Sequence, residues 1–492
     1  MESVNNIIVD EERPLKIYFI PYLASGHLIP QADITRLFAS RGHHVTVLTT
    51  PSNAQLFLKS NPYLHRNYRV QIFPFPADQV GLPAGIENLT GIKTFDDSLK
   101  LHSGASLLQE PFTNFIEQDP PDCIVGDFLY PWLHDLAIKL RIPRFAFNGF
   151  CLFTICAMES LRLHRMEPTG PYLVPDLPGK ITMNTAPPKF AKDFIENLLD
   201  TEAKSDGILV NNFIELDGEE YVEYYEKITG HKAWHVGPAC LVRRTTEEKA
   251  VRGTEKSVLN VEDCLSWLDS KRVNSVVYVS FGTICQFPDS QLYEIACGLE
   301  ASGCEFIWVV PEKKGKESES EAEKEKWLPK GFEERNKTKG MVIRGWAPQV
   351  LILGHVAVGG ILTHCGWNST SEAVSVGVPM ITWPLHSDQF YNEKLICEVR
   401  GIGVEIGVDE WSNDGYGEKE KVVGRLEIEK GVRRVMDGGD EAEGIRRRVE
   451  EFKKKAREAV QEGGSSYNNL TSLIHEIRRL IRHKRLKLHK FE

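Results

Sequence analysis

One stretch of polar residues in the second half of the chain has the types and spacing that diphosphate binding requires. Residues 361–376 are predicted to form a short apolar strand, a Gly-containing turn, and a helix that begins near Asn368 or Ser369. The start of a helix presents backbone N–H groups without intrahelical partners and the positive end of the helix dipole, and both favour a bound anion. His364 in the turn, together with Asn368 and Ser369, can donate hydrogen bonds to phosphate oxygens. The stretch therefore predicts a phosphate-binding turn.

Residues around this turn could bind the rest of a sugar nucleotide. Glu372 follows Asn368 by about one helical turn, on the same face, so its carboxylate can accept hydrogen bonds from two ribose hydroxyls. Trp346 offers a flat surface for a uracil ring. Asp388 and Gln389 supply acceptors and donors for sugar hydroxyls. The residue types together predict a site for a nucleotide diphosphate that carries a sugar.

These residues also have ordinary structural interpretations. Asn368 and Ser369 could be N-caps, which is the commonest reason for such residues before a helix. Trp367 is expected to pack against and shape the turn, because a buried Trp usually serves the core. Capping is the simpler interpretation of either polar residue alone. It does not explain why His364 and Glu372 stand beside them.

The whole stretch from Trp346 to Gln389 resembles the donor-binding signature of the plant secondary-product glycosyltransferases, family 1 of the nucleotide-sugar-dependent enzymes. The resemblance implies a GT-B architecture, in which two Rossmann-like, doubly wound α/β domains face each other across a cleft. It also implies a UDP-sugar as donor substrate. In this family a Gln at the last signature position goes with glucose, so UDP-glucose is the expected donor, while UDP-xylose, UDP-galactose and UDP-glucuronate stay open. The donor contacts that it implies are Trp346, Ala347, Gln349, His364, Trp367, Asn368, Ser369, Glu372, Asp388 and Gln389.

A base for an acceptor hydroxyl is expected at His27. This residue follows a predicted strand at 16–23, at the carboxyl edge of the sheet, where ligands bind in open α/β folds. A neutral imidazole can take a proton near physiological pH. Asp127 ends another predicted strand on that edge, where it could fix the imidazole tautomer. The residues alone leave this distant pairing open, but GHLIP and VGDFLYPW resemble the family segments that carry the base and its orienting acid. A single in-line displacement would turn an α-linked donor into a β-glycoside.

The elements that must position these residues form two α/β series. At 492 residues the chain exceeds the size that one core usually supports. Gly26 would let the backbone pass close to substrate, and Ser280 and Thr283 flank a Gly-bearing loop suited to phosphate approach. We expect an acceptor-binding domain, a polar linker, a UDP-sugar-binding domain, and a C-terminal helix that, as the resemblance implies, packs back on the first domain. The expected boundaries are 1–241, 242–257, 258–467 and 468–492.

Composition narrows the environment and the partners. The net charge of −10 argues against nucleic acid as a partner, and no apolar run approaches the length of a membrane span. The basic C-terminal segment RRLIRHKRLKLHK could suggest membrane or nucleic-acid contact, although such residues are favoured at a helix C-terminus. The ten cysteines show no metal-binding or disulfide pattern, and the acidic N-terminus lacks a secretory pattern. We expect a cytoplasmic monomer without membrane insertion.

Neither a metal nor another cofactor is expected, because the chain has no D-x-D triplet and the helix N-terminus and His364 could meet the diphosphate charge.

The acceptor that the resemblance implies is a small lipophilic plant metabolite, such as a flavonoid or a triterpenoid saponin, that offers a hydroxyl or a carboxyl group. A non-catalytic sugar-nucleotide-binding protein of the same fold is one alternative. A nicotinamide-dependent oxidoreductase is another, disfavoured because the chain has no G-x-G-x-x-G turn followed by an acidic residue at the expected distance.

Overall fold

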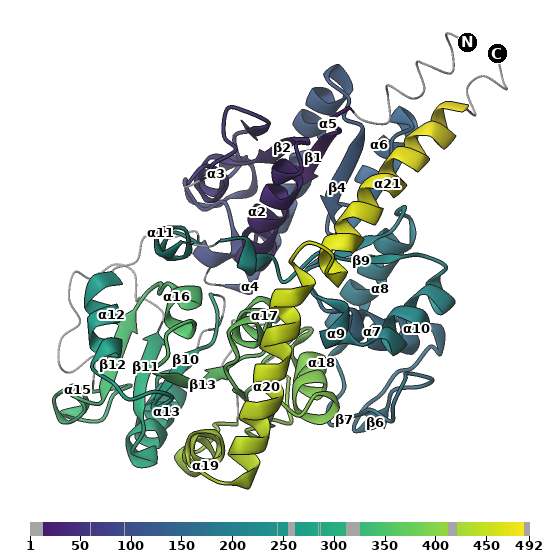
Figure 1. Ribbon diagram of the computed structural model, residues 1–492. Helices are drawn as coiled ribbons and strands as arrows, with labels where there is room; N and C mark the ends of the chain where they lie inside the picture. The colour runs from purple at the N-terminus through teal and green to yellow at the C-terminus, as the bar shows by residue number, and fades with distance from the viewer. Residues whose placement is uncertain are drawn as a thin grey trace.

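Two parallel β-sheets, each with helices packed around it, organise the chain in the computed structural model (Figure 1). The structure describes residues 13–59, 61–92, 94–243, 245–253, 261–283, 285, 287–310, 325–411 and 421–486. The expected doubly wound α/β fold is thereby confirmed. Parts of the predicted N-terminus, of the linker and of the basic C-terminal segment, namely 1–12, 244, 254–257 and 487–492, lie outside the described residues.

The first sheet belongs to the N-terminal half, and all its strands are parallel. From β1 the chain adds β2 and β3 on one side, and it then returns to add β4 and the later strands on the other side of β1. The direction of strand order therefore reverses between β1 and β4. Ligands bind at such a switch point, outside the carboxyl ends of the strands. In sheet order the strands are β3 (Tyr68–Ile72), β2 (His44–Thr49), β1 (Lys16–Ile20), β4 (Cys123–Asp127), β5 (Arg144–Asn148), β8 (Ile208–Val210) and β9 (Ala233–His235).

The second sheet repeats this plan in the C-terminal half, with its switch point between β10 and β13. The strands are rich in branched apolar residues, as in β10 (VVYVS), which is buried along its whole length. Such continuous burial is typical of parallel strands covered on both faces. In sheet order they are β12 (Gly340–Arg344), β11 (Glu305–Val310), β10 (Val276–Ser280), β13 (Val358–Thr363), β14 (Met380–Thr382) and β15 (Gly403–Glu405).

Helices connect the strands and cover the sheets (Figure 1). The first half also contains a small antiparallel pair, β6 (Tyr172–Leu173) and β7 (Thr182–Met183). The helices of the first half are α2 (Ser25–Ser40), α3 (Pro51–Leu58), α4 (Phe95–Leu107), α5 (Gln109–Gln118), α6 (Leu133–Leu140), α7 (Leu152–Leu163), α8 (Lys189–Ala203), α9 (Ile214–Asp217) and α10 (Glu219–Thr229). Those of the second half are α12 (Val261–Asp269), α13 (Asp289–Ser302), α15 (Phe332–Arg335), α16 (Gln349–Leu353), α17 (Trp367–Val376), α18 (Gln389–Lys394), α19 (Arg425–Met436) and α20 (Asp440–Ala459). Short 3-10 turns are η1 (Asp78–Val80), η2 (Leu89–Gly91) and η3 (Ala239–Val242), and η4 (Leu395–Val399) is a π-helix.

Two helices begin earlier than the sequence predicts. Residues 24–30, which follow the first predicted strand, contain Gly26 and Pro30 and so have the composition of a turn, but α2 begins at Ser25 and carries Gly26 and His27 in its first turn. We expected α17 to begin at Asn368 or Ser369, but it begins at Trp367. Gly26 and Pro30 are poor helix formers, which is why the sequence does not predict a helix there. A Gly near a helix start costs little, however, and packing against the sheet outweighs local propensity.

The C-terminal helix crosses from one domain to the other. Figure 1 shows α20 in the second domain and α21 (Ser465–Leu486), in yellow, running along the first. Its apolar residues join the core formed by the first sheet, where Leu473 and Ile477 are fully buried. At the domain boundary, Ser466 Oγ donates to the carbonyl oxygen of Gly237 at 2.5 Å. The helix thereby ties the end of the chain to the first domain.

The predicted linker is more ordered than its polar composition suggests. Residues Thr246–Ala250 form a short helix, α11, with a capping box at Thr245. Arg243 and Arg252 are buried, and both donate to the carboxylate of Asp33 in α2, at 2.6 and 2.7 Å. Charged residues in this segment therefore serve as anchors between the domains, which composition alone did not indicate.

The described residues contain no helix that is both long and apolar enough to cross a membrane. The ten cysteines all lie within the described residues, and none forms a disulfide.

Replacing Leu473 with Ala should destabilise the first domain. Deleting a fully buried Leu side chain removes apolar contacts and leaves a cavity, at a cost of roughly 2–5 kcal/mol. Leu426→Ala is the matched control, because Leu426 is 71% exposed. Urea unfolding of both variants measures the difference, and an equal free energy of unfolding would contradict the packing of α21 described above.

Candidate active site

The predicted base and its orienting acid meet at the switch point of the first sheet. His27 Nδ1 lies 2.8 Å from Asp127 Oδ2. The strand ends explain this contact, because Ile20 at the end of β1 pairs with Gly126, the residue before Asp127 in β4. Asp127 is fully buried, whereas the side chain of His27 keeps 17% of its surface exposed. The pair therefore has one buried member and one that a substrate can reach.

The carboxylate of Asp127 is fixed by further donors. Gln31 Nε2 donates to Oδ2 at 3.2 Å, and the backbone N–H of Leu129 donates to Oδ1 at 3.2 Å. Because a carboxylate only accepts hydrogen bonds, His27 Nδ1 must carry the proton in this pair. Nε2 of His27 is then the basic nitrogen, which is the arrangement that general-base catalysis needs.

Charge tunes the basicity of His27. Burial by itself lowers the pKa of an imidazole, but the carboxylates of Asp127 and Asp388 act in the opposite sense and raise the pKa of His27 above its ordinary value of 6.5. Asp388 belongs to the second domain, at the start of α18. The two halves of the site come close to each other, because Asn368 of the second domain donates to the carbonyl oxygen of Gly26, next to His27, at 2.9 Å.

Aromatic side chains surround the base. The rings of Tyr22 and Phe128 lie 5.9 and 5.5 Å from the His27 ring, and Phe150 lies 5.8 Å from Phe128. The hydroxyl of Tyr22 hydrogen-bonds to His102 Nδ1. These rings form an apolar wall beside the base, which suits a flat or polycyclic molecule that carries a reactive hydroxyl.

The predicted phosphate-binding turn lies at the switch point of the second sheet. Ser280 at the end of β10 pairs with Thr363 at the end of β13, and the turn runs from there to the start of α17. Cys365 within it has a left-handed backbone, with φ of 62°. Such a conformation is uncommon for a residue with a side chain and is concentrated at functional sites. The turn directs the N-terminus of α17 toward the first domain, where α2 lies against it.

Two glycines make room for His364. A Cβ at Gly282 would lie 2.7 Å from the His364 ring, and a Cβ at Gly366 would lie 2.4 Å from it. Burial, with a smaller effect of His386, lowers the pKa of His364 to about 3. His364 is therefore neutral at physiological pH and can offer an N–H but no charge. Its Nδ1 is buried and has no hydrogen-bond partner among the described residues, and its contact with a phosphate stays a prediction.

Asn368 links the two domains through a carbonyl that Pro30 leaves free. A proline inside α2 has no N–H to donate to the carbonyl of Gly26, one helical turn earlier. Asn368 Nδ2 donates to that oxygen instead, at 2.9 Å. The start of α17 thus contacts the helical turn that carries His27. The predicted approach of Gly26 to the substrate stays a prediction.

The other polar residues of α17 form a connected group. Gln349 Nε2 donates to Ser369 Oγ at 3.0 Å and to Glu372 Oε2 at 2.8 Å. Arg252 of the linker pairs with Glu372 Oε1. A carboxylate has about four lone-pair positions, so Glu372 can still accept from ribose hydroxyls. Arg252 and Gln349 fix the orientation in which it would do so.

The expected uracil platform lies against the linker. A Cβ at Gly253 would lie 2.4 Å from the indole of Trp346, so only glycine allows the backbone this close. Ala347 next to Trp346 is buried. The linker therefore packs on the Trp346 indole as well as on Glu372.

Gln389 and Asp388, the two residues predicted to bind the sugar, offer different hydrogen-bonding groups. Gln389 Oε1 accepts the backbone N–H groups of Leu385 and His386, at 2.8 and 3.0 Å. The oxygen is committed to this turn, so the amide nitrogen is the group that can bind a sugar hydroxyl. Burial raises the pKa of Asp388 to about 6. In the predicted site Asp388 would be the acceptor of the pair, and its contact with a sugar stays a prediction.

The remaining predicted residues have different surroundings. Trp367 is buried, and its indole N–H donates to the carbonyl oxygen of Asn211 in the first domain at 2.9 Å. This contact agrees with the packing interpretation of Trp367. Ser280 is buried at the end of β10, and Thr283 is exposed after the glycine turn. A direct ligand contact from these three residues stays a prediction.

Sequence reasoning missed three residues that the structure places beside the site. Gln31 holds Asp127, Arg252 holds Glu372, and Asn392 donates to Asp388 Oδ2 at 2.6 Å. A helix that begins at Ser25 puts Gln31 one turn after His27, so a correct helix start would have revealed it. No local pattern identifies Arg252, because Asp33 and Glu372 lie far away in sequence. Asn392 follows Asp388 by one helical turn, so a correct helix start would have indicated that contact but not those with Cys365 and Thr154.

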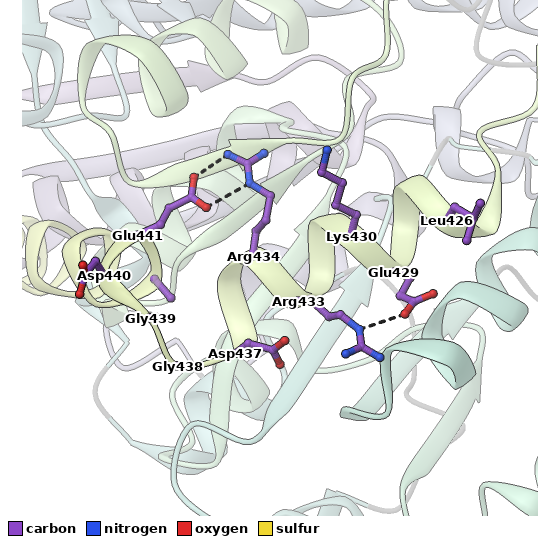
Figure 2. Close-up of a pocket in the computed structure, with 11 residues that line it drawn as sticks. Leu426, Glu429, Lys430, Arg433, Arg434, Asp437, Gly438, Gly439, Asp440 and Glu441 are labelled. Atoms are coloured by element: carbon purple, nitrogen blue, oxygen red, sulfur yellow. Dashed lines mark hydrogen bonds and ion pairs between the residues drawn. The ribbon is translucent and has the colours of Figure 1, made fainter.

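A surface pocket of about 570 Å³ lies between α19 and α20, away from these residues (Figure 2). Its arginines are already paired: Arg433 with Glu429 at 3.0 Å and Arg434 with Glu441 at 2.6 Å. The pocket contains none of the predicted site residues. We interpret it as a solvated charged groove.

Among the described residues, no group of three or more His, Cys, Asp or Glu side chains could hold a metal ion. The expectation of a reaction without metal stays a prediction.

Gly282→Ala should weaken binding of UDP. The new Cβ would press on the His364 ring and would need a left-handed backbone, with φ of 76°. We expect a loss of affinity of about tenfold or more, or at least 1.4 kcal/mol. Gly303→Ala is the control, because Gly303 has nearly the same φ, 72°, but open space around its Cα. Calorimetric titration with UDP measures both, and wild-type affinity in Gly282→Ala would contradict the assigned role of His364.

Comparison with known proteins agrees with this geometry. The sequence profile described as "UDP-glucoronosyl and UDP-glucosyl transferase" matches residues 260–423. The chain is 46% identical to UDP-glucosyl transferase 73CC6 of Saponaria officinalis, over 95% of this chain and 97% of the relative. It is 42% identical to scopoletin glucosyltransferase of Nicotiana tabacum, over 94% and 98%.

Solved structures give the same result. The crystal structure of Glycyrrhiza uralensis UGT73P12, complexed with glycyrrhetinic acid 3-O-monoglucuronide, matches with a TM-score of 0.86 and 40% identity, covering 97% of this chain and 99% of that one. Arabidopsis thaliana UGT89C1, complexed with UDP-L-rhamnose, matches with a TM-score of 0.75 and 30% identity, covering 95% and 99%. The GT-B architecture is thereby confirmed. With these matches over nearly its whole length, the chain belongs to the plant UDP-glycosyltransferases and is a UDP-dependent glycosyltransferase.

Proposed function

We propose that this enzyme transfers glucose from UDP-glucose to a hydroxyl or carboxyl group of a small lipophilic plant metabolite, with inversion to a β-glycoside. The observation that carries the proposal is the hydrogen bond between His27 and the buried Asp127, with Asp388 of the other domain close enough to raise the pKa of His27. A base on one domain thus faces a sugar-binding carboxylate on the other.

In the proposed reaction, the acceptor proton passes to His27 Nε2 as the acceptor oxygen attacks the anomeric carbon. The bond from that carbon to the diphosphate oxygen breaks, and UDP leaves with the electron pair. Asp127 stabilises the imidazolium that forms. The N-terminus of α17 and the neutral His364 stabilise the charge that develops on the diphosphate, so the step needs no metal.

The donor is proposed to be UDP-glucose. Gln389 occupies the last signature position, and its committed oxygen leaves the amide nitrogen as the donor toward a sugar hydroxyl. Asp388 provides the complementary acceptor. Relatives named as glucosyltransferases support this choice.

The acceptor class follows from the surroundings of the base and from the relatives. The rings of Tyr22, Phe128 and Phe150 favour a lipophilic molecule. Relatives are named for scopoletin and for flavonoids, and one matching structure contains a triterpenoid glucuronide. The alternative of a non-catalytic binding protein gives no role to a base oriented by a buried carboxylate.

Replacing Asp127 with Asn should shift the pH dependence of transfer. His27 must be neutral to accept a proton, and its pKa is raised, so kcat/KM of the wild type should rise with pH through a midpoint above 6.5. Asp127→Asn removes a carboxylate that raises this pKa, so the midpoint should move to lower pH, while the plateau falls by roughly 10²–10⁴-fold. The measurement is kcat/KM across pH. Asp135→Asn, at an exposed position in α6, is the control. A midpoint that stays in place or moves upward would count against His27 as the base.

The proposal as a whole is tested by mixing purified protein with UDP-glucose, without added metal, and a panel of flavonols, coumarins, and triterpenoid alcohols and acids. Mass spectrometry should show a gain of one hexose on at least one acceptor. His27→Ala should abolish this gain and leave UDP affinity unchanged, because the base acts on the acceptor. Binding of UDP without transfer to any acceptor would contradict the proposal, and so would transfer by His27→Ala at the wild-type rate.

A further inference from the structure

Asn392 in α18 is a fully buried amide with every hydrogen-bonding position occupied. Its Nδ2 donates to Asp388 Oδ2 at 2.6 Å and to the carbonyl oxygen of Cys365 at 2.8 Å. Its Oδ1 accepts from Thr154 Oγ1 at 2.9 Å and from Cys151 Sγ at 3.3 Å. An amide has two N–H bonds and two lone pairs, so this side chain is saturated.

These contacts fix the amide in one orientation. A carboxylate and a backbone carbonyl can only accept, so the nitrogen must face Asp388 and Cys365. The oxygen must then face Thr154 and Cys151. A buried side chain with four partners in opposed directions cannot turn without leaving several buried polar groups unsatisfied, which is costly. Asn392 is therefore a rigid connector.

The two sides of this connector belong to different domains. Thr154 and Cys151 lie in and just before α7 of the first domain, whereas Asp388 and Cys365 lie in the donor-binding stretch of the second. Cys365 is the left-handed residue that follows His364 in the phosphate-binding turn. Next to Asn392, the Tyr391 hydroxyl lies 3.2 Å from that of Tyr172 in the first domain. The start of α18 is thus clamped to the acceptor domain at two points.

We propose that Asn392 is a positioning residue for the donor sugar, which holds Asp388 in its sugar-binding orientation and makes that orientation depend on contact with α7. This inference rests on the proposed function, in which Asp388 accepts a hydroxyl of the sugar. Asn392 itself touches neither substrate. It acts through Asp388, and contact between the domains thereby aligns the sugar with His27.

A double-mutant cycle separates this role from a general effect on folding. We would measure kcat and KM for UDP-glucose, and the affinities for UDP and UDP-glucose, in the wild type, Asn392→Ala, Asp388→Ala and the double variant. If Asn392 acts through Asp388, Asn392→Ala should lower kcat/KM by about ten- to a hundredfold, the usual effect of small displacements at a reacting centre. Once Asp388 is absent, removing Asn392 should cost nothing further. UDP affinity should stay unchanged, because UDP lacks the sugar.

Two further variants test the link between the domains. Thr154→Val removes the hydrogen bond to Asn392 Oδ1, together with the 3.2 Å contact between the Thr154 hydroxyl and Cys151 Sγ. It should lower kcat/KM for UDP-glucose in the same direction with UDP affinity intact. Asn336→Ala is the control: Asn336 is also buried in the second domain, where it bonds to Glu300 and to the Phe332 carbonyl, and its loss should change stability alone.

The inference would be overturned if the fold-loss of kcat/KM in the double variant equalled the product of the losses in Asp388→Ala and Asn392→Ala. It would also be overturned if Asn392→Ala lost affinity for UDP and for UDP-glucose equally. If the wild type transfers no sugar, the proposed function fails. The inference is then still decided by binding: the ratio of UDP-glucose affinity to UDP affinity should be lower in Asn392→Ala than in the wild type.

Discussion

The site depends on how firmly the two domains are held against each other, because the proposed base and the proposed donor-binding residues lie on separate domains. Asp127 ends β4 of the first sheet and His27 lies beside it in α2, whereas Asp388 lies at the start of α18 in the second domain. Hydrogen bonds cross the boundary at several points, including the buried one from the Trp367 indole to the Asn211 carbonyl and an exposed one from Asn368 to the Gly26 carbonyl. A small rotation of one domain would break them together, so the interface fixes the distance between acceptor and donor.

Charge also holds the domains in place. The Asp33 carboxylate in α2 is fully buried and receives both Arg243 and Arg252, and Arg252 continues to Glu372 in α17. A buried ion pair often adds little net stability, because removing charges from water costs about as much as their attraction returns. Here these ion pairs fix geometry rather than add stability. Long polar side chains with fixed partners set one relative position of α2, the linker and α17.

The sequence predicts the parts of this site that local pattern determines. A strand, a glycine turn and a helix start are visible around His364. Two strand ends at one sheet edge make the pairing of His27 with Asp127 feasible, but only the family resemblance of the two segments singles it out. Sequence does not reveal why Asn368 reaches Gly26, because that contact needs the missing N–H of Pro30 and the closure of the domains. Arg252 escapes detection for the same reason, and so do the contacts of Asn392 with Cys365 and Thr154. Each looks like an ordinary polar residue until distant segments surround it.

The central claim is that one base on one domain and one UDP-sugar on the other perform a single displacement. The most direct test is the anomeric configuration of the isolated product, read from the coupling constant of the anomeric proton by NMR. With the α-linked donor UDP-glucose, the account predicts a β-glycoside. An α-glycoside would contradict it, because retention requires a second displacement that the pair of His27 and Asp127 does not provide.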